Sequence, residues 1–200
     1  MFEYVLLAFA LGFKHSFDAD HLVAVSNLLA KARSFGNALK LSMNWAVGHM
    51  LTAIIITGFL FSFKDTILSS VLGYFEIIVA FMLVILGIVS IYHAFYAEES
   101  KEDYKHPHEK NAFGIGIIHG LASNDELFIL ITASLGLTSF ADRVFGVGIF
   151  SMGVVVGMCL YAIFCSIPFI AARSKKFHQI LHGSIGIMSL LYGLFLLIHP

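Results

Sequence analysis

Six apolar segments constrain the fold of this chain most strongly, because each is long enough to cross a lipid bilayer as a helix. A spanning helix needs about 20 mostly apolar residues. The segments that reach this length are residues 2–30, 39–63, 67–96, 112–138, 144–172 and 177–199. Charged residues make up only 12% of the chain, about half of what a soluble domain carries. The sequence therefore predicts an all-α membrane protein with six transmembrane helices.

Lysine and arginine are distributed unevenly over the loops between these segments. Cytoplasmic loops of membrane proteins carry an excess of both residues. The first, third and fifth loops contain Lys31, Arg33, Lys40, Lys101, Lys105, Lys110, Arg173, Lys175 and Lys176, whereas the opposite side has Lys64 and Arg143. This asymmetry predicts a multi-pass protein of the cytoplasmic membrane with both termini outside the cell.

One clearly polar segment, residues 97–111, divides the chain near its midpoint. We expect it to be a solvated cytoplasmic linker. An alternative is a weak metal-collecting loop that uses His106 and His108.

The two halves on either side of this linker repeat a pattern of residues. The matches pair His15 with His119, Asp20 to Leu22 with Asp125 to Leu127, Gly48 with Gly153 and Gly87 with Gly193, at offsets of 104 to 106 residues. Three helices in each half would make the second half enter the membrane from the opposite side. The sequence thus predicts two inverted three-helix repeats, residues 1–96 and 112–200, with a substrate site near the midplane where they meet.

Glycines in the second half have a spacing that favours close helix packing. Gly116-x-x-x-Gly120 and Gly153-x-x-x-Gly157 fit the small-xxx-small pattern that lets the backbones of membrane helices approach each other. We therefore expect tight contacts at these positions.

The first apolar segment contains the densest group of ionisable residues, with His15, Asp18, Asp20 and His21 inside seven consecutive positions. A charged side chain costs about 3 kcal/mol at the bilayer centre on insertion scales. On a regular helix, Asp18 and His21 lie about 60° and 120° from His15, whereas Asp20 lies about 140° away on the other side. Asp20 therefore either orients a ligating imidazole, or the helix unwinds locally.

Imidazole together with carboxylate points to a divalent metal such as Ni²⁺, Co²⁺, Zn²⁺ or Mn²⁺. A Na⁺ or K⁺ site would not need imidazole, and an anion site would need more basic residues than Lys14 alone. Further polar residues inside the apolar segments could complete the site, and these are Asn44, His49, His119, Asn124, Asp125 and Glu126. We predict that metal ligands come from these two sets of residues.

The run His15-Ser-Phe-Asp18-Ala-Asp20-His21-Leu resembles the signature of the nickel/cobalt transporter (NiCoT) family and the wider NicO group. The segment Trp45-Ala-Val-Gly-His49-Met-Leu-Thr is similar to the second motif of the family. The resemblance implies a permease that moves Ni²⁺ or Co²⁺ through the cytoplasmic membrane. It also implies that the first-motif His and Asp residues are essential, which here are His15, Asp20 and His21, with Asp18 beside them and His49 in the second motif.

The later part of the chain departs from the family pattern. Members usually have eight helices, against six predicted here. The third family motif, Gly-x-Asp-Thr-Ala-Thr-Glu, is met by Gly120 and Glu126, but Ala122 stands where its internal aspartate would be. The Asp pair of the fourth motif is absent after Gly157. The chain is therefore expected to be a minimal member of the group.

We predict a secondary transporter, not an enzyme, that carries a divalent transition-metal ion and has no other cofactor. Its expected partners are the bilayer and the ion, and the protein could also form a homo-oligomer. A net charge of −1 gives no basis for binding nucleic acid. The direction is open, so an exporter is an alternative. A second alternative is a metal-handling accessory protein or intramembrane metalloenzyme. A third is a thiol-disulfide carrier, which would need a reactive cysteine in each half, whereas Cys159 and Cys165 both lie in the fifth segment.

Overall fold

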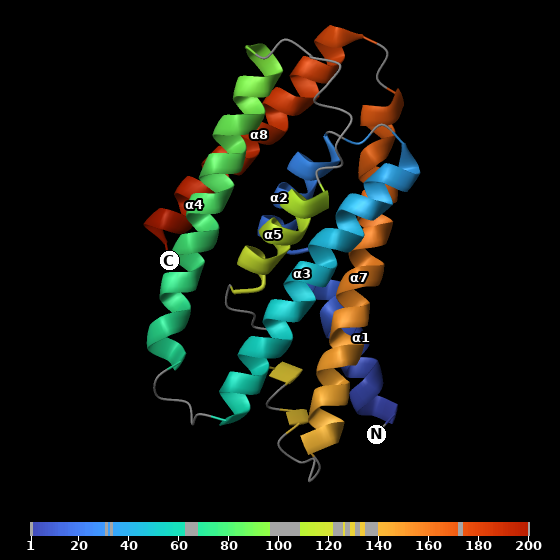
Figure 1. The fold of residues 1–200 in the computed structure, drawn as a ribbon, viewed down its shortest axis with the longest axis vertical. Coiled ribbons are helices and arrows are strands. Elements are labelled where there is room, and N and C mark those ends of the chain that lie inside the picture. The colour runs from blue at the N-terminus through green and yellow to red at the C-terminus, as the bar shows by residue number, and fades with distance from the viewer. Residues whose placement is uncertain are drawn as a thin grey trace.

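The computed structural model of the protein is a bundle of helices (Figure 1). It describes residues 2–30, 32, 34–62, 68–96, 109–121, 126, 129–130, 133–134, 140–171 and 174–199. Its longer helices, in chain order, are α1 (Phe2–His15), α2 (Ala19–Leu29), α3 (Phe35–Ser62), α4 (Leu68–Phe95), α5 (Glu109–His119), α7 (Phe140–Ala171) and α8 (Lys175–Ile198).

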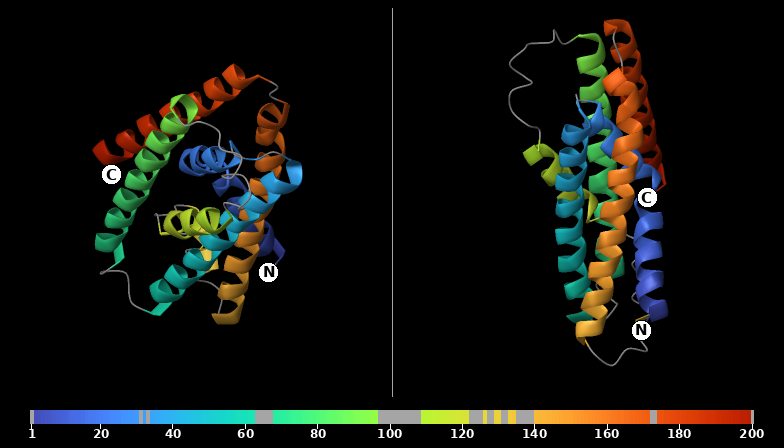
Figure 2. Two further views of the ribbon diagram at one scale, coloured as in Figure 1. Left: turned by 45° about the horizontal axis from the view of Figure 1, so that its top comes forward. Right: turned by 90° about the vertical axis from the view of Figure 1, so that its right-hand side faces the viewer.

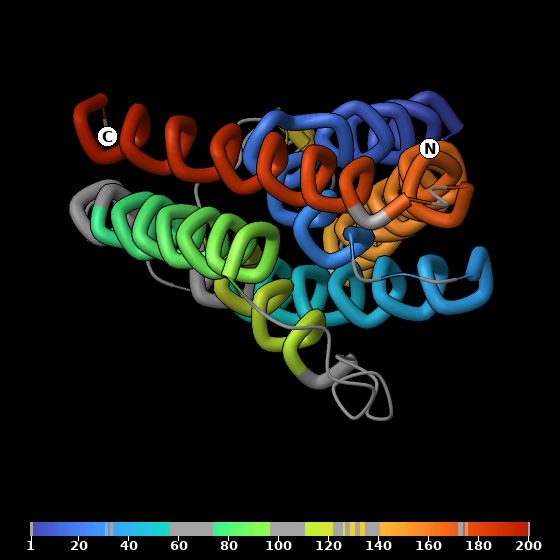
Figure 3. Tube along the Cα trace, turned by 90° about the horizontal axis from the view of Figure 1, so that it is seen from above, coloured from blue at the N-terminus to red at the C-terminus, as the bar shows by residue number. Residues whose placement is uncertain are grey.

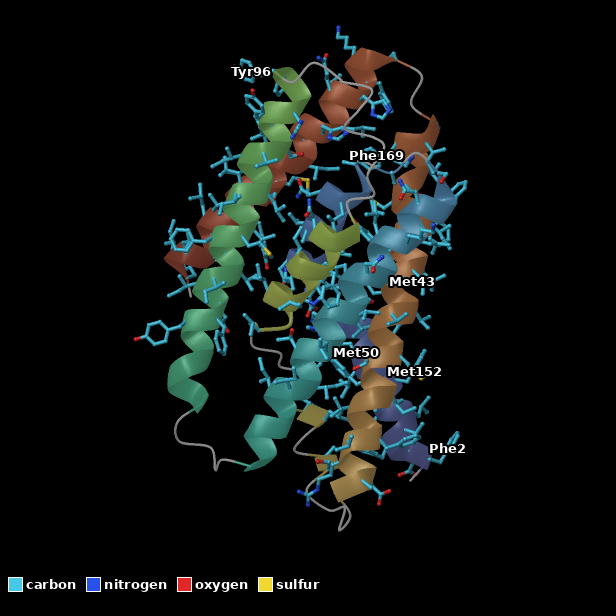
Figure 4. All side chains as sticks on the ribbon, viewed as in Figure 1. Phe2, Met43, Met50, Tyr96, Met152 and Phe169 are labelled. Atoms are coloured by element: carbon cyan, nitrogen blue, oxygen red, sulfur yellow. The ribbon has the colours of Figure 1, made fainter. Side chains whose placement is uncertain are left out.

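Four of these helices correspond to single predicted spanning segments. Their stretches long and apolar enough to cross a membrane are Phe35–Ile56, Tyr74–Phe95, Ala141–Ala171 and Lys176–Ile198. Large apolar side chains lie on the outside of the bundle. Phe2 and Tyr96, at opposite ends of the molecule in Figure 4, are 80% and 76% exposed. Apolar exposure on this scale suits lipid, and the chain is an all-α, multi-pass membrane protein.

The first predicted segment, residues 2–30, is broken in the middle instead of forming one helix. The amide of Ser16 still bonds to the Gly12 carbonyl, but the amides of Phe17 and Asp18 bond only three residues back. Asp18 has an extended backbone, with φ −65° and ψ 145°, and α2 begins directly after it. Of the two possibilities for Asp20, local unwinding is the one that the structure shows.

The predicted segment 112–138 is not one continuous helix either. Helix α5 begins at Glu109, inside the predicted linker, and ends at His119. A turn follows, in which the amide of Leu121 bonds to the Ile118 carbonyl. Helices α1 and α5 thus both end at a histidine. The linker residues 97–108, with His106 and His108, lie outside the described part of the chain.

The helices pack mainly in pairs. Helix α1 runs along α7 and α5 runs along α3, while α3 and α7 cross (Figures 1 and 2). Helices α4 and α8 form a further pair. The short helix α2 contacts α3, α4, α5, α7 and α8, and Figure 3 shows it from above among these helices. The break that precedes α2 therefore lies inside the bundle.

Glycines permit the closest of these helix contacts. A Cβ atom on Gly12 of α1 would overlap the Phe150 carbonyl of α7, and one on Gly116 of α5 would overlap the Trp45 carbonyl of α3. The other glycines of the predicted spacing motifs behave alike. A Cβ on Gly120 would overlap α3, one on Gly153 would overlap α1, and one on Gly157 would overlap the side chain of Ser16, which directly follows α1. The tight contacts predicted from the glycine spacing are confirmed.

Candidate metal site

The break between α1 and α2 brings the first group of ionisable residues together. His15 ends α1 and His21 lies in the first turn of α2, with their ring centroids 4.5 Å apart. The Asp18 carboxylate lies 2.8 Å from His15 Nδ1. Asp20 Oδ1 lies 2.9 Å from His21 Nδ1. A continuous helix would have turned Asp20 away from His15, so the break allows it to join the cluster.

Two more histidines reach the same point from other helices. His49 of α3 has its Nε2 atom 3.2 Å from His21 Nε2, and its ring centroid lies 5.4 Å from that of His15. His119, at the end of α5, has its ring centroid 5.2 Å from that of His21. All four imidazoles are between 1% and 3% exposed. Buried polar groups are costly unless they are satisfied, so this concentration of imidazoles favours a ligand.

The helix ends at the break complement the charges that they carry. The last turn of α1 carries Lys14 and His15, and the first turn of α2 carries Asp20, with Asp18 just before it. Basic groups are stabilised at the C-terminus of a helix and acidic groups at its N-terminus, by about 0.3–1 kcal/mol each. The order of basic and acidic residues along the sequence therefore favours a break at this place.

Glu126 extends the cluster from the second half of the chain. Its Oε2 atom lies 3.4 Å from His15 Nδ1. Its other oxygen, Oε1, forms an ion pair with the Lys14 ammonium. The His15 imidazole is thus bordered by two carboxylates, those of Asp18 and Glu126.

Two buried ring nitrogens in the cluster have no hydrogen-bond partner within the described part of the chain, His21 Nδ1 and His119 Nε2. Both face Asp20. The first is 2.9 Å from its carboxylate but not aligned for a hydrogen bond, and the second is 3.9 Å away. A buried polar group left unsatisfied costs about 1–3 kcal/mol. The residues around Asp20 therefore have unused polar capacity, which fits a site that binds an ion.

Trp45 of α3 orients one of these histidines. Its indole is fully buried, and its Nε1 donates to His119 Nδ1 at 3.3 Å. An indole nitrogen can only donate, so in a neutral His119 ring the proton lies on Nε2, the atom that faces Asp20. His119 is thereby set to donate toward the Asp20 carboxylate. Groups of this kind orient metal ligands and strengthen their binding.

The described residues contain three overlapping groups whose ligand atoms lie within 4.8 Å of one another. These groups are His15 with His21 and His49, Asp20 with His21 and His119, and His15 with Asp18 and Glu126. The first is all nitrogen and the third is mostly oxygen. Because His15 and His21 are shared, the groups form one continuous cluster.

The predicted candidates that the structure brings together are His15, Asp18, Asp20, His21, His49, His119 and Glu126. Asn44 does not join them, because its side-chain amide donates to the Lys40 carbonyl of its own helix at 2.9 Å. Five residues along a helix place Asn44 about 140° from His49, which explains why only His49 reaches the cluster. Asn124 and Asp125 lie outside the described residues.

The sequence did not identify Trp45 as part of the cluster, nor Lys14 as a partner of Glu126. Trp45 had one available signal, its spacing of four from His49, which places both on one side of a helix. The contact between Lys14 and Glu126 joins residues 112 positions apart, and no local pattern indicates it.

Comparison with known families identifies the group to which the chain is related. Residues 1–148 match NicO, described as "High-affinity nickel-transport protein". This match covers most of the chain, including all the clustered histidines and Glu126.

The chain belongs to the NicO family.

A curated relative of this NicO protein is "Urease accessory protein UreH" from Bacillus sp. (strain TB-90). It is 27% identical over 202 residues, which cover 94% of the chain and 87% of the relative. No solved structure matches the chain. Membership of a transport family confirms the predicted resemblance and the prediction that the protein is not an enzyme.

Neither cysteine belongs to a ligand group among the described residues. Cys159 and Cys165 are both free thiols on α7, and Cys165 Sγ lies 3.7 Å from Ser26 Oγ. A thiol-disulfide carrier built from two halves would need a cysteine from each, and both of these come from the second half. The NicO match likewise favours metal transport over this alternative.

Proposed function

We propose that this NicO protein is a secondary transporter that carries Ni²⁺, with Co²⁺ as the alternative ion, through the histidine cluster. The observation that carries this proposal is the set of four buried imidazoles gathered with three carboxylates around the helix break. Borderline divalent ions favour such mixed ligands. The description of the family supports nickel as the first choice.

The separation of two nitrogens supports direct coordination. Two nitrogens bound to one ion at about 2.0–2.1 Å are roughly 3.0–3.4 Å apart in ordinary geometries. The Nε2 atoms of His21 and His49 are 3.2 Å apart. These two residues are therefore proposed as ligands, with His15 third and the carboxylates of Asp18, Asp20 and Glu126 completing the shell or neutralising the ion. His119, held by Trp45, is proposed to orient Asp20.

We further propose six membrane crossings, arranged as inverted repeats of residues 1–96 and 112–200 joined by the linker. The contact of Gly12 with Phe150 and the contact of Gly116 with Trp45 support this arrangement. Gly116 follows Gly12 by 104 positions and Phe150 follows Trp45 by 105. The same contact therefore occurs twice, with the halves exchanged, as a two-fold axis requires.

The pair formed by α4 and α8 supports the same arrangement. A Cβ on Gly87 would overlap the backbone nitrogen of Leu190, and one on Gly193 would overlap that of Val84. The two contacts are equivalent under the proposed repeat, because Gly193 follows Gly87 by 106 positions and Leu190 follows Val84 by 106. Rocking of one repeat against the other would then expose the cluster to each side in turn. The charge asymmetry of the loops favours termini on the outside.

Two points about the biological role follow from different observations. The cluster fits import and export equally, because ligand geometry does not set direction.

The relative named as a urease accessory protein favours a second candidate, a membrane accessory protein that supplies nickel for urease assembly. Expression in a nickel-sensitive host separates the directions, since an importer raises cellular nickel and an exporter lowers it.

The proposal is tested by nickel uptake into vesicles reconstituted with purified protein. His15→Ala and His21→Ala should abolish uptake, because each removes a histidine that belongs to two of the ligand groups. His93→Ala is the matched control, since His93 is an exposed histidine near the end of α4. Uptake at the wild-type level in both cluster variants would contradict the site assignment. Nickel binding without uptake would favour the accessory role.

A further inference from the structure

Lys14 occupies a position that a metal transporter would be expected to keep free of cations. Its ammonium forms an ion pair with Glu126 Oε1. The other oxygen of the same carboxylate faces His15 Nδ1 at 3.4 Å, and Glu126 belongs to the oxygen-rich ligand group. The lysine therefore binds a carboxylate that the ion would need.

The two members of this ion pair differ strongly in exposure. The Lys14 side chain is 68% exposed, whereas that of Glu126 is only 7% exposed. A lysine side chain has a flexible four-carbon stem, so Lys14 can withdraw its ammonium while the buried carboxylate stays in place. Its position in the last turn of α1 keeps it near the helix end, where a positive charge is stabilised.

The formal charges of the cluster favour exchange of one cation for the other. Asp18, Asp20 and Glu126 carry three negative charges. With neutral imidazoles, the Lys14 ammonium offsets one of these charges while it holds Glu126, and a divalent ion that replaces it offsets two. An ammonium has three donors and no lone pair, so it can hold the carboxylate without coordinating a metal.

We infer that Lys14 is an internal competing cation, which holds Glu126 while the site is empty and is displaced when a divalent ion binds. This inference rests on the proposed metal transport. The ion pair between Lys14 and Glu126 joins α1 to the second half of the chain. When a metal ion displaces Lys14, a link between the two halves is therefore lost. Competition lowers the apparent affinity for metal, because part of the binding energy is spent on displacing Lys14. It also helps the ion to leave, since the ammonium returns to the carboxylate.

The test is equilibrium binding of Ni²⁺ to the purified full-length protein in detergent. Lys14→Leu should bind Ni²⁺ about tenfold more tightly, within the usual range of coupling between sites, and should release it more slowly in vesicles. Lys14→Arg keeps the charge and should not gain affinity. In a Glu126→Gln background, Lys14→Leu should have no effect, because the competition needs the carboxylate.

A second measurement uses the wild-type protein and needs no variant. Ni²⁺ should increase acylation of Lys14 by an amine-reactive reagent, read by mass spectrometry, while exposed Lys40 and Lys176 stay unchanged. Unaltered or weaker nickel binding by Lys14→Leu, or acylation of Lys14 that nickel does not change, would overturn the inference while wild-type binding upholds the proposed function. A wild-type protein that binds no Ni²⁺ would overturn both.

Discussion

The two helix ends that meet in the cluster differ in chemistry more than in backbone. Helix α1 ends at His15 and α5 ends at His119. Each imidazole lies 5.6 Å from an aromatic ring of the other half, Phe150 for His15 and Trp45 for His119. Similar helix ends thus pack against similar partners. The proposed repeat accounts for this shared scaffold, whereas the metal chemistry depends on what each half adds to it.

The first half contributes most of the proposed ligands. It supplies His15, Asp18, Asp20, His21 and His49, whereas the second half supplies His119 and Glu126 among the described residues. The aromatic partners also differ, because Trp45 donates a hydrogen bond to His119 and a phenylalanine has no donor. His15 Nδ1 instead contacts the carboxylates of Asp18 and Glu126. A symmetric scaffold with asymmetric ligands would let one half hold the ion while the other orients and releases it.

The largest expected effect comes from replacing His21 and its counterpart in the proposed repeat, Glu126. His21→Ala should weaken Ni²⁺ binding by more than about 100-fold, because loss of a ligand should exceed the roughly 10- to 100-fold cost of losing a supporting group. Glu126→Gln should weaken binding by only about tenfold, since Glu126 belongs to one ligand group and His21 to two. Calorimetric titration measures both, and equal losses would contradict the assignment of the ligands to the first half.

The next effect concerns the scaffold. Gly12→Ala and Gly116→Ala should each destabilise the fold by roughly 1–3 kcal/mol, because the added methyl group overlaps a backbone carbonyl that cannot move easily. Thermal unfolding in detergent provides the measurement. Gly114→Ala is the control on α5, since a Cβ there meets nothing within 4 Å. Destabilisation by only one of the two substitutions would argue against equivalent contacts in the two halves.

Trp45→Phe makes the two aromatic partners alike and tests what the indole adds. It should weaken Ni²⁺ binding by about tenfold, as expected for loss of a group that orients a ligand. The effect should vanish in a His119→Gln background, because Trp45 acts through His119. An equal loss in both backgrounds would show that Trp45 contributes through packing alone.

The smallest effect is expected at Asn44. Its amide bonds within α3 and not to the cluster, so Asn44→Ala should change nickel binding less than twofold, in line with substitutions away from buried networks. A larger loss in the same titration would place Asn44 among the ligands and extend the share of the first half still further.

The sequence by itself determined the membrane class of the chain and most of its metal-binding residues. Apolar length and low charge predicted a multi-pass helical protein, because the cost of burying charge in lipid depends on composition alone. The close spacing of His15, Asp18, Asp20 and His21 and the resemblance to the NicO group identified most of the cluster, because both can be read from the order of residues in the sequence. Chemical type and local order are properties that a single chain displays without its fold.

Only the tertiary structure decided how these residues meet. Helical periodicity alone separated Asp20 from His15, and the break at Asp18 brings them into one cluster. The packing of α3 turns His49 into the cluster and leaves Asn44 outside it. It also places Trp45 against His119. The ion pair of Lys14 with Glu126 spans 112 positions. Distances of this kind follow from how closely helices approach at Gly12 and Gly116, and that approach is set by the packing of segments far apart in the sequence.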